Sequence, residues 1–166
     1  MKKALTLNVI FCLSAALLVL TFSTCKKDTA KGNTSIIGKW SNKVFSHNDI
    51  IGQYEFKTND SVVFYTFKID TVSKSVIGYS YKSIGTYKIE NAKLTMNMVS
   101  FANTGGNFVP LAQLVQSNGS ATSIYTIVLD SQKNQLSLYF TCSPAGNCVP
   151  SPIIYYRGNI YGLLTD

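Results

Sequence analysis

The amino-acid sequence predicts an all-β protein: a single antiparallel meander β-barrel of about eight strands, preceded by a cleaved N-terminal signal peptide. Apolar and polar residues alternate along most of the chain after its N-terminal region, which is typical of strands with one solvent-exposed face. Short polar turn sequences separate these segments. Among 166 residues there are ten Tyr and nine Phe, which favour strands, and only 14% of the residues are charged.

The alternation is the main evidence for the strands, because side chains at every second position of a strand share one face. Polar sequences at 58–60, 91–92 and 131–134 predict the hairpin turns between them. The segments 124–129 and 153–156 are apolar on both faces, so their register stays open. The apolar positions that share a face are Tyr54 and Phe56; Val63, Tyr65, Phe67 and Ile69; Tyr87 and Ile89; Leu94, Met96 and Met98; and Leu136, Leu138 and Phe140.

One segment breaks the alternation. Residues 103–107 predict a loop, and Leu111, Leu114 and Val115 are spaced like one face of a helix. Residues 117–120 predict a loop again. We expect a short helical cap over one end of the barrel, and the alternative is a lid or a loop that contacts a partner.

The N-terminal residues carry the pattern of a secretory signal. Lys2 and Lys3 precede the apolar run 4–22, as the basic region precedes the apolar region of a signal peptide. The run is long enough to span a membrane. The basic pair at 26–27 would then lie on the translocated side, whereas retained basic residues normally lie on the cytoplasmic side. We therefore expect residues 1–24 to be a cleaved signal.

The end of this signal points to a lipid anchor. Leu20-Thr21-Phe22-Ser23-Thr24-Cys25 resembles the lipobox of bacterial lipoproteins, in which the cysteine is diacylated and becomes the mature N-terminus. The resemblance implies attachment of palmitate-type chains at Cys25 and a flexible tether over 25–35. It also implies a place in the cell envelope, anchored in the outer membrane of a Gram-negative bacterium. The alternative is an ordinary cleaved signal with an incidental cysteine.

Residues 36–166 form the predicted barrel domain. Its first strand opens with Gly38-Lys39-Trp40, and its last strand candidate ends at Arg157. This start resembles the Gly-x-Trp signature of lipocalins, a family of calycin-type barrels. In lipocalins the Trp closes the base of the barrel and an Arg of the final strand packs across it, so the resemblance implies that Trp40 and Arg157 are a barrel-closing pair. A guanidinium over an indole contributes about 0.5–2 kcal/mol. The alternative is a plain core Trp and a solvated Arg.

Two further cysteines, Cys142 and Cys148, flank a turn-rich loop in this exported domain. A disulfide is the default expectation there. Free thiols are the alternative. Zinc is disfavoured, because two cysteines and the distant His47 do not complete a four-ligand site.

The chain contains few His, Asp and Glu residues that could act as catalytic acids or bases. It has one His and eight acidic residues, and it contains no motif for a nucleophile elbow, a phosphate loop or a zinc protease. His47 lies in a predicted loop with no recognisable nucleophile beside it. We expect no enzyme activity and no cofactor. The net charge of +7 comes from scattered lysines and a single Arg, so we expect no nucleic-acid partner.

The leading functional hypothesis is a membrane-anchored binding module that holds a small hydrophobic or amphipathic ligand inside the barrel. The alternative is a non-catalytic envelope protein with a filled barrel, which binds a protein or polymer partner through its surface. A large interior cavity would favour the first hypothesis, and a packed interior would favour the second. The side chains predicted to line the ligand site are Tyr54, Phe56, Tyr65, Phe67, Tyr87, Met96 and Met98.

Overall fold

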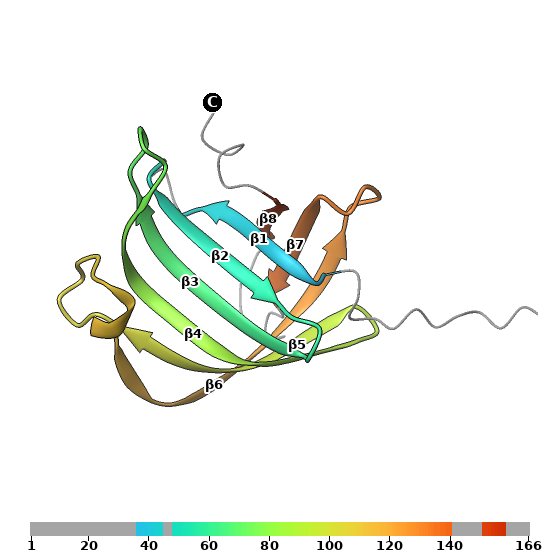
Figure 1. Ribbon diagram of the computed structural model, residues 1–166. Helices are drawn as coiled ribbons and strands as arrows, with labels where there is room; N and C mark the ends of the chain where they lie inside the picture. Colours follow the sequence, from blue (N-terminus) through green and yellow to red (C-terminus); the bar gives the residue numbers. More distant parts are fainter. Residues whose placement is uncertain (1–35, 45–47, 141–150, 159–166) are drawn as a thin grey trace, which may run out of the picture. The chain divides into compact units, whose positions relative to one another are not determined.

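The computed structural model describes residues 36–44, 48–140 and 151–158. Within these ranges the chain forms eight antiparallel strands in sequence order, and the last strand pairs with the first to close a barrel (Figure 1). The predicted all-β meander barrel is confirmed. The strands are β1 (Gly38–Lys43), β2 (Ile50–Phe56), β3 (Ser61–Ile69), β4 (Val76–Glu90), β5 (Lys93–Ala102), β6 (Val115–Leu129), β7 (Gln135–Phe140) and β8 (Ile153–Arg157).

Several sequence predictions lie outside the described residues. These are the signal peptide 1–24, the lipid site Cys25 with the tether 25–35, His47, and the disulfide between Cys142 and Cys148. Among the residues that are described, no helix has the length and apolar character needed to cross a membrane.

All three predicted turns connect neighbouring strands. Asn91 and Ala92 have φ values of 50° and 62°, and this left-handed backbone gives a two-residue turn the twist that a hairpin needs. Between β6 and β7, Asp130 Oδ1 accepts hydrogen bonds from the backbone N–H groups of Asn134 at 2.6 Å and Gln135 at 2.9 Å. Local backbone conformation therefore supports the turn at 91–92, and a local side-chain acceptor supports the turn at 131–134.

Side chains from all eight strands meet inside the barrel and form its main core. The rings of Tyr54 on β2 and Tyr155 on β8 are 5.2 Å apart, and those of Phe56 on β2 and Tyr87 on β4 are 5.0 Å apart. These strands are not neighbours in the sheet, so the contacts reach across the interior. The buried members of this core are Ile36, Trp40, Tyr54, Phe56, Val62, Tyr87, Leu94, Met96, Met98, Tyr125, Leu136, Leu138 and Tyr155.

A second, smaller apolar cluster lies on the opposite face of the sheet, where Ile51, Phe67 and Ile69 are buried. The register shows this directly, because Tyr54 pairs with Phe64 while its neighbour Gln53 pairs with Tyr65. Paired residues of an antiparallel sheet point to one side, and successive residues point to opposite sides.

The prediction that Tyr65 and Phe67 line the barrel interior is therefore wrong. Both side chains point outward, and Val62 and Phe64 take the inward positions of β3. The sequence Ser61–Ile69 is apolar on both faces. For that reason its alternation shows which residues share a face but not which face is inside.

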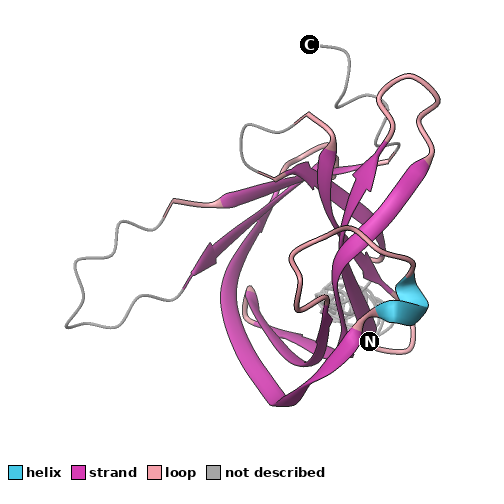
Figure 2. Cartoon of the chain, turned by 90° about the vertical axis from the view of Figure 1, so that its left-hand side faces the viewer, coloured by secondary structure: helices cyan, strands magenta, loops and turns pink. Residues whose placement is uncertain are grey.

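The segment 103–120 also differs from the prediction. Its helix is the single 3-10 turn η1 (Leu111–Gln113), which lies in a loop at one end of the barrel (Figure 2). Leu114 is already extended, and β6 begins at Val115 and runs through the predicted loop 117–120. Ser120 and Gln116 pair with Val99 and Phe101 of β5, and the register shifts between these pairs, so residues 117–119 form an irregularity within β6 that has no register partner on β5.

The loop that carries η1 is held against β4. Tyr79 and Val109 form a two-way backbone bridge, with N···O distances of 2.8 and 2.9 Å. A Cβ atom at Gly78 would lie 2.9 Å from the backbone of both Phe108 and Val109. Only glycine allows this approach, and the approach, together with the bridge at Tyr79, holds the loop beside β4.

Candidate functional site

Trp40 and Arg157 meet at the seam where β8 pairs with β1. They are register partners, and the guanidinium carbon lies 4.4 Å from the centre of the indole ring system. Arg157 Nε donates to the carbonyl of Lys133 at 2.9 Å, and its Nη1 donates to the carbonyl of Ile37 at 3.1 Å. The Trp40 indole N–H donates to the carbonyl of Ile36 at 2.6 Å. The pair joins the first and last strands, and its role is structural.

Five of the seven predicted ligand-binding residues lie in the packed core: Tyr54, Phe56, Tyr87, Met96 and Met98. Their side chains contact one another and the rest of the core, so they fill the part of the interior that they line. Burial, followed by the nearby phenols of Tyr155 and Tyr125, raises the pKa of Tyr54. The Tyr87 hydroxyl donates to the carbonyl of Lys57 at 3.0 Å.

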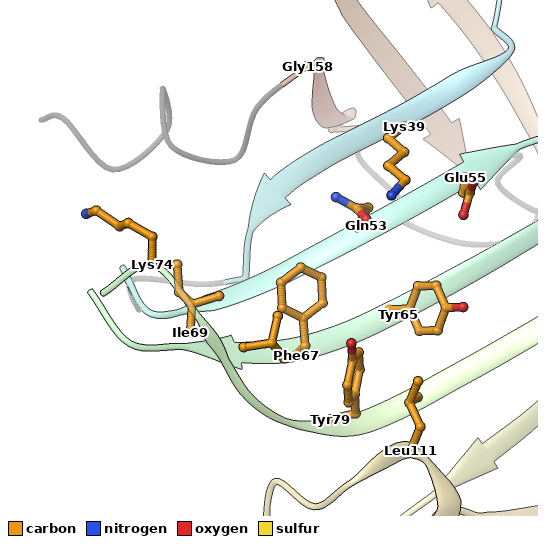
Figure 3. Close-up of a pocket in the computed structure, with 11 residues that line it drawn as sticks. Lys39, Gln53, Glu55, Tyr65, Phe67, Ile69, Lys74, Tyr79, Leu111 and Gly158 are labelled. Atoms are coloured by element: carbon orange, nitrogen blue, oxygen red, sulfur yellow. The ribbon is translucent and has the colours of Figure 1, made fainter. Parts of the chain in front are cut away.

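The other two predicted residues, Tyr65 and Phe67, line a cavity of about 460 Å³. It lies on the outward face of β1 to β4 and is named here the outer groove (Figure 3). Its described lining residues are Lys39, Gln53, Glu55, Tyr65, Phe67, Ile69, Lys74, Val76, Tyr79, Leu111 and Gly158.

Aromatic side chains from β3 and β4 form one side of the outer groove. The ring of Tyr79 lies 5.7 Å from that of Tyr65 and 5.8 Å from that of Phe67, and both pairs are tilted. A shift in the register of β3 and β4 next to Phe67 pairs that residue with Tyr79. These bulge-like irregularities redirect side chains, and here the result brings three aromatic rings together on the outward face.

Polar side chains from β1 and β2 form the other side (Figure 3). Lys39 and Glu55 are register partners, and Gln53 lies on the same face two residues before Glu55. The Gln53 amide Nε2 donates to the hydroxyl of buried Ser41 at 2.8 Å. This bond orients the amide. A glutamine carbonyl oxygen is an acceptor with two lone pairs, so the groove presents an amide, a carboxylate and an ammonium along one edge.

The electrostatics of the outer groove keep the phenol of Tyr65 protonated. Burial raises the pKa of Tyr65 above its ordinary value of 10.0, and the Glu55 carboxylate and Tyr79 add to this effect. Tyr65 is therefore a hydrogen-bond donor throughout the neutral pH range. In the part of the chain that the structure describes, no three His, Cys, Asp or Glu side chains come close enough together to hold a metal ion.

Sequence reasoning missed most of the outer groove. Gln53 and Glu55 alternate with the apolar residues Tyr54 and Phe56, as the polar face of an ordinary strand does. Lys39, Tyr79 and Leu111 come together with them only through register and loop position. One signal was available. A strand apolar on both faces needs both faces covered or occupied, and β3 is such a strand.

Fold and site together define a small, closed, eight-stranded meander barrel with a packed core inside and a groove of mixed polarity on its outward face. No family model, curated protein or solved structure matches the chain.

Proposed function

We propose that this protein is a lipid-anchored, non-catalytic binding module of the bacterial cell envelope, which holds its partner in the outer groove. The contrast between the two faces of β2 and β3 carries the proposal. Inward aromatic rings contact each other across the barrel, while outward ones line a hollow of about 460 Å³. Sites for small ligands commonly have volumes of about 300–1,000 Å³.

The anchored part of the proposal rests on the sequence around Cys25. Two acyl chains give stable attachment to a membrane where one chain gives marginal binding. The packing of Arg157 on Trp40 supports the further proposal that the barrel is lipocalin-like, because the same pairing is what that resemblance implies.

A ligand held inside the barrel is less favoured than one in the outer groove. Tyr54 and Phe56 contact Tyr155 and Tyr87 across the interior, so a ligand there would have to separate them and expose or displace a packed core. Interiors of this kind tolerate little added volume. The groove needs no such rearrangement.

Photocrosslinking in living cells tests the proposal. A benzoylphenylalanine at Tyr65, inside the outer groove, is compared with one at Tyr139 on β7. Tyr139 follows the core residue Leu138 and so points outward, and none of the described lining residues lies on β7. We expect an adduct to an envelope component from position 65 and none from 139. Equal adducts from both positions, or none from 65, would contradict the proposal.

The anchor has its own test, which is growth with labelled palmitate. We expect the wild-type chain to carry label and to sediment with membranes, and the Cys25→Ala chain to do neither. A Cys25→Ala chain that still carried label would contradict lipid attachment at Cys25.

A further inference from the structure

We infer that the outer groove binds a saccharide, with one face of a sugar ring against the aromatic side and the ring hydroxyls along the polar side. This inference rests on the proposed function, since it names the class of ligand for the same groove. It depends on two unlike sets of side chains that lie side by side on one outward sheet face and line one cavity, with Gln53 of the polar side paired with Tyr65 of the aromatic side (Figure 3).

The aromatic wall suits one face of a sugar. Half-buried Tyr65 and Tyr79 present ring surface beside the buried ring of Phe67, with the ring centre of Tyr79 5.7 Å from that of Tyr65 and 5.8 Å from that of Phe67. The face of an aromatic ring is electron-rich, and the C–H groups on the apolar face of a pyranose are weak donors to such a surface. Leu111 extends this wall from the loop.

The polar wall suits the edge of the same sugar. Lys39 is a donor, Glu55 an acceptor, and Gln53 carries both functions. Each sugar hydroxyl is at once a donor and an acceptor, so adjacent hydroxyls pair with such a mixed row. The bond from Gln53 to Ser41 holds the amide in place before the ligand arrives, which lowers the ordering cost of binding.

Two other ligand classes fit this arrangement less well. An acyl chain would cover Gln53, Glu55 and Lys39 without replacing their hydrogen bonds to water, and burial of unpaired polar groups is unfavourable. A simple anion would lie beside the Glu55 carboxylate and leave the three aromatic rings unused. A peptide segment is the remaining rival, and one candidate is the chain's own stretch 159–166, which follows the lining residue Gly158.

Titration calorimetry on the full chain tests the inference. The probes are N,N′-diacetylchitobiose, cellobiose and maltose, with decanoate as the apolar comparison. We expect at least one saccharide to bind and decanoate to bind more weakly. The Tyr79→Leu variant keeps apolar bulk but loses the ring, and we expect its affinity for that saccharide to fall about tenfold, or about 1.4 kcal/mol.

Matched variants keep the result interpretable. Tyr139→Leu makes the same substitution on an outward strand that lacks described lining residues, and it should bind like the wild type. Glu55→Gln is nearly isosteric, so it tests the polar wall even if Tyr79→Leu fails to fold. We expect it to weaken binding severalfold, and thermal melts of all variants report folding.

Several outcomes would overturn the inference: no binding of any of the three saccharides to the wild type, stronger binding of decanoate, or unchanged affinity in both Tyr79→Leu and Glu55→Gln. A chain ending at Gly158 that binds saccharide when the full chain does not would assign the groove to residues 159–166. A protein adduct at position 65 in cells would retain the proposed function but overturn the saccharide. Saccharide binding in solution without any adduct in cells would retain the saccharide inference but contradict the proposed function.

Discussion

The inward and outward faces of β2 and β3 carry similar side chains with different consequences. Phe56 and Phe67 are both buried phenyl rings, with 1% and 4% of their surface exposed. Phe56 contacts Tyr87 across the closed interior, whereas Phe67 contacts Tyr79 at the wall of the outer groove. Burial alone therefore does not distinguish an aromatic residue that only stabilises the fold from one that lines a site. The two cases differ in what the ring faces, which is the closed interior for Phe56 and the outer groove for Phe67.

The largest predicted effect comes from truncating these two rings. Phe56→Ala should lower the free energy of unfolding by about 3–5 kcal/mol, because it leaves a closed cavity in the core. Phe67→Ala should cost about 1–3 kcal/mol, since its vacated space opens into a groove that water can enter. Urea unfolding of both variants measures the difference. Equal losses would mean that the two faces are equally closed.

The seam between β1 and β8 gives the next largest effect. Arg157→Ala removes the contact with Trp40 and two hydrogen bonds to carbonyls. We expect a loss of about 1–2 kcal/mol in unfolding free energy. Arg157→Lys should recover little of it, because an ammonium cannot stack and bond in this planar fashion. Full stability of the lysine variant in urea would show that charge alone is sufficient.

The turn between β4 and β5 gives a smaller effect, and here the substitution is expected to increase stability. Ala92 has a φ of 62°, a backbone region that an L side chain occupies at a cost and glycine occupies freely. Ala92→Gly should therefore stabilise the protein by about 0.5–1 kcal/mol, visible as a higher midpoint of thermal unfolding. Asn91, the other residue of this turn, tolerates the same region better, so Asn91→Gly should change the midpoint less.

The smallest effect concerns pH. Backbone N–H groups of Ser73 and Val72 hold the pKa of Asp70 below its ordinary value of 3.8. Because the folded pKa is the lower one, the unfolded chain takes up protons first as pH falls. The stability from Asp70 is thus complete above its unfolded pKa and is lost as pH falls through the folded value. Asp70→Asn should flatten this part of the acid unfolding curve, and an unchanged curve would contradict the assignment.

The fold was largely predictable from the sequence, and the site was not. Alternation and turn residues are local signals, and they were sufficient for the barrel and its three predicted turns. The face of Tyr65 and Phe67 depends on which side of a doubly apolar strand closes inward, and that is set by pairing with β2 and β4. The path of β6 through 117–119 likewise depends on the pairing of the flanking residues Gln116 and Ser120 with β5.

The outer groove could not be predicted from the sequence for a related reason. Its polar wall comes from β1 and β2, its aromatic wall from β3 and β4, and Leu111 from a loop further along the chain. Each part has an ordinary local sequence. They come together only when strand register places the side chains of β1 to β4 on one face and the contact at Gly78 holds the loop of Leu111 beside β4. Such juxtapositions carry no local signature.

Methyl NMR on the full chain tests most directly whether the outward face, and not the interior, binds. The saccharide probe with the highest affinity is titrated while the side-chain methyl signals are followed. We expect shifts for Ile69 and Leu111, which line the outer groove, and none for Met96 and Met98, which lie in the core. Shifts of the two Met signals with Ile69 and Leu111 unchanged would place the ligand inside the barrel and contradict the account.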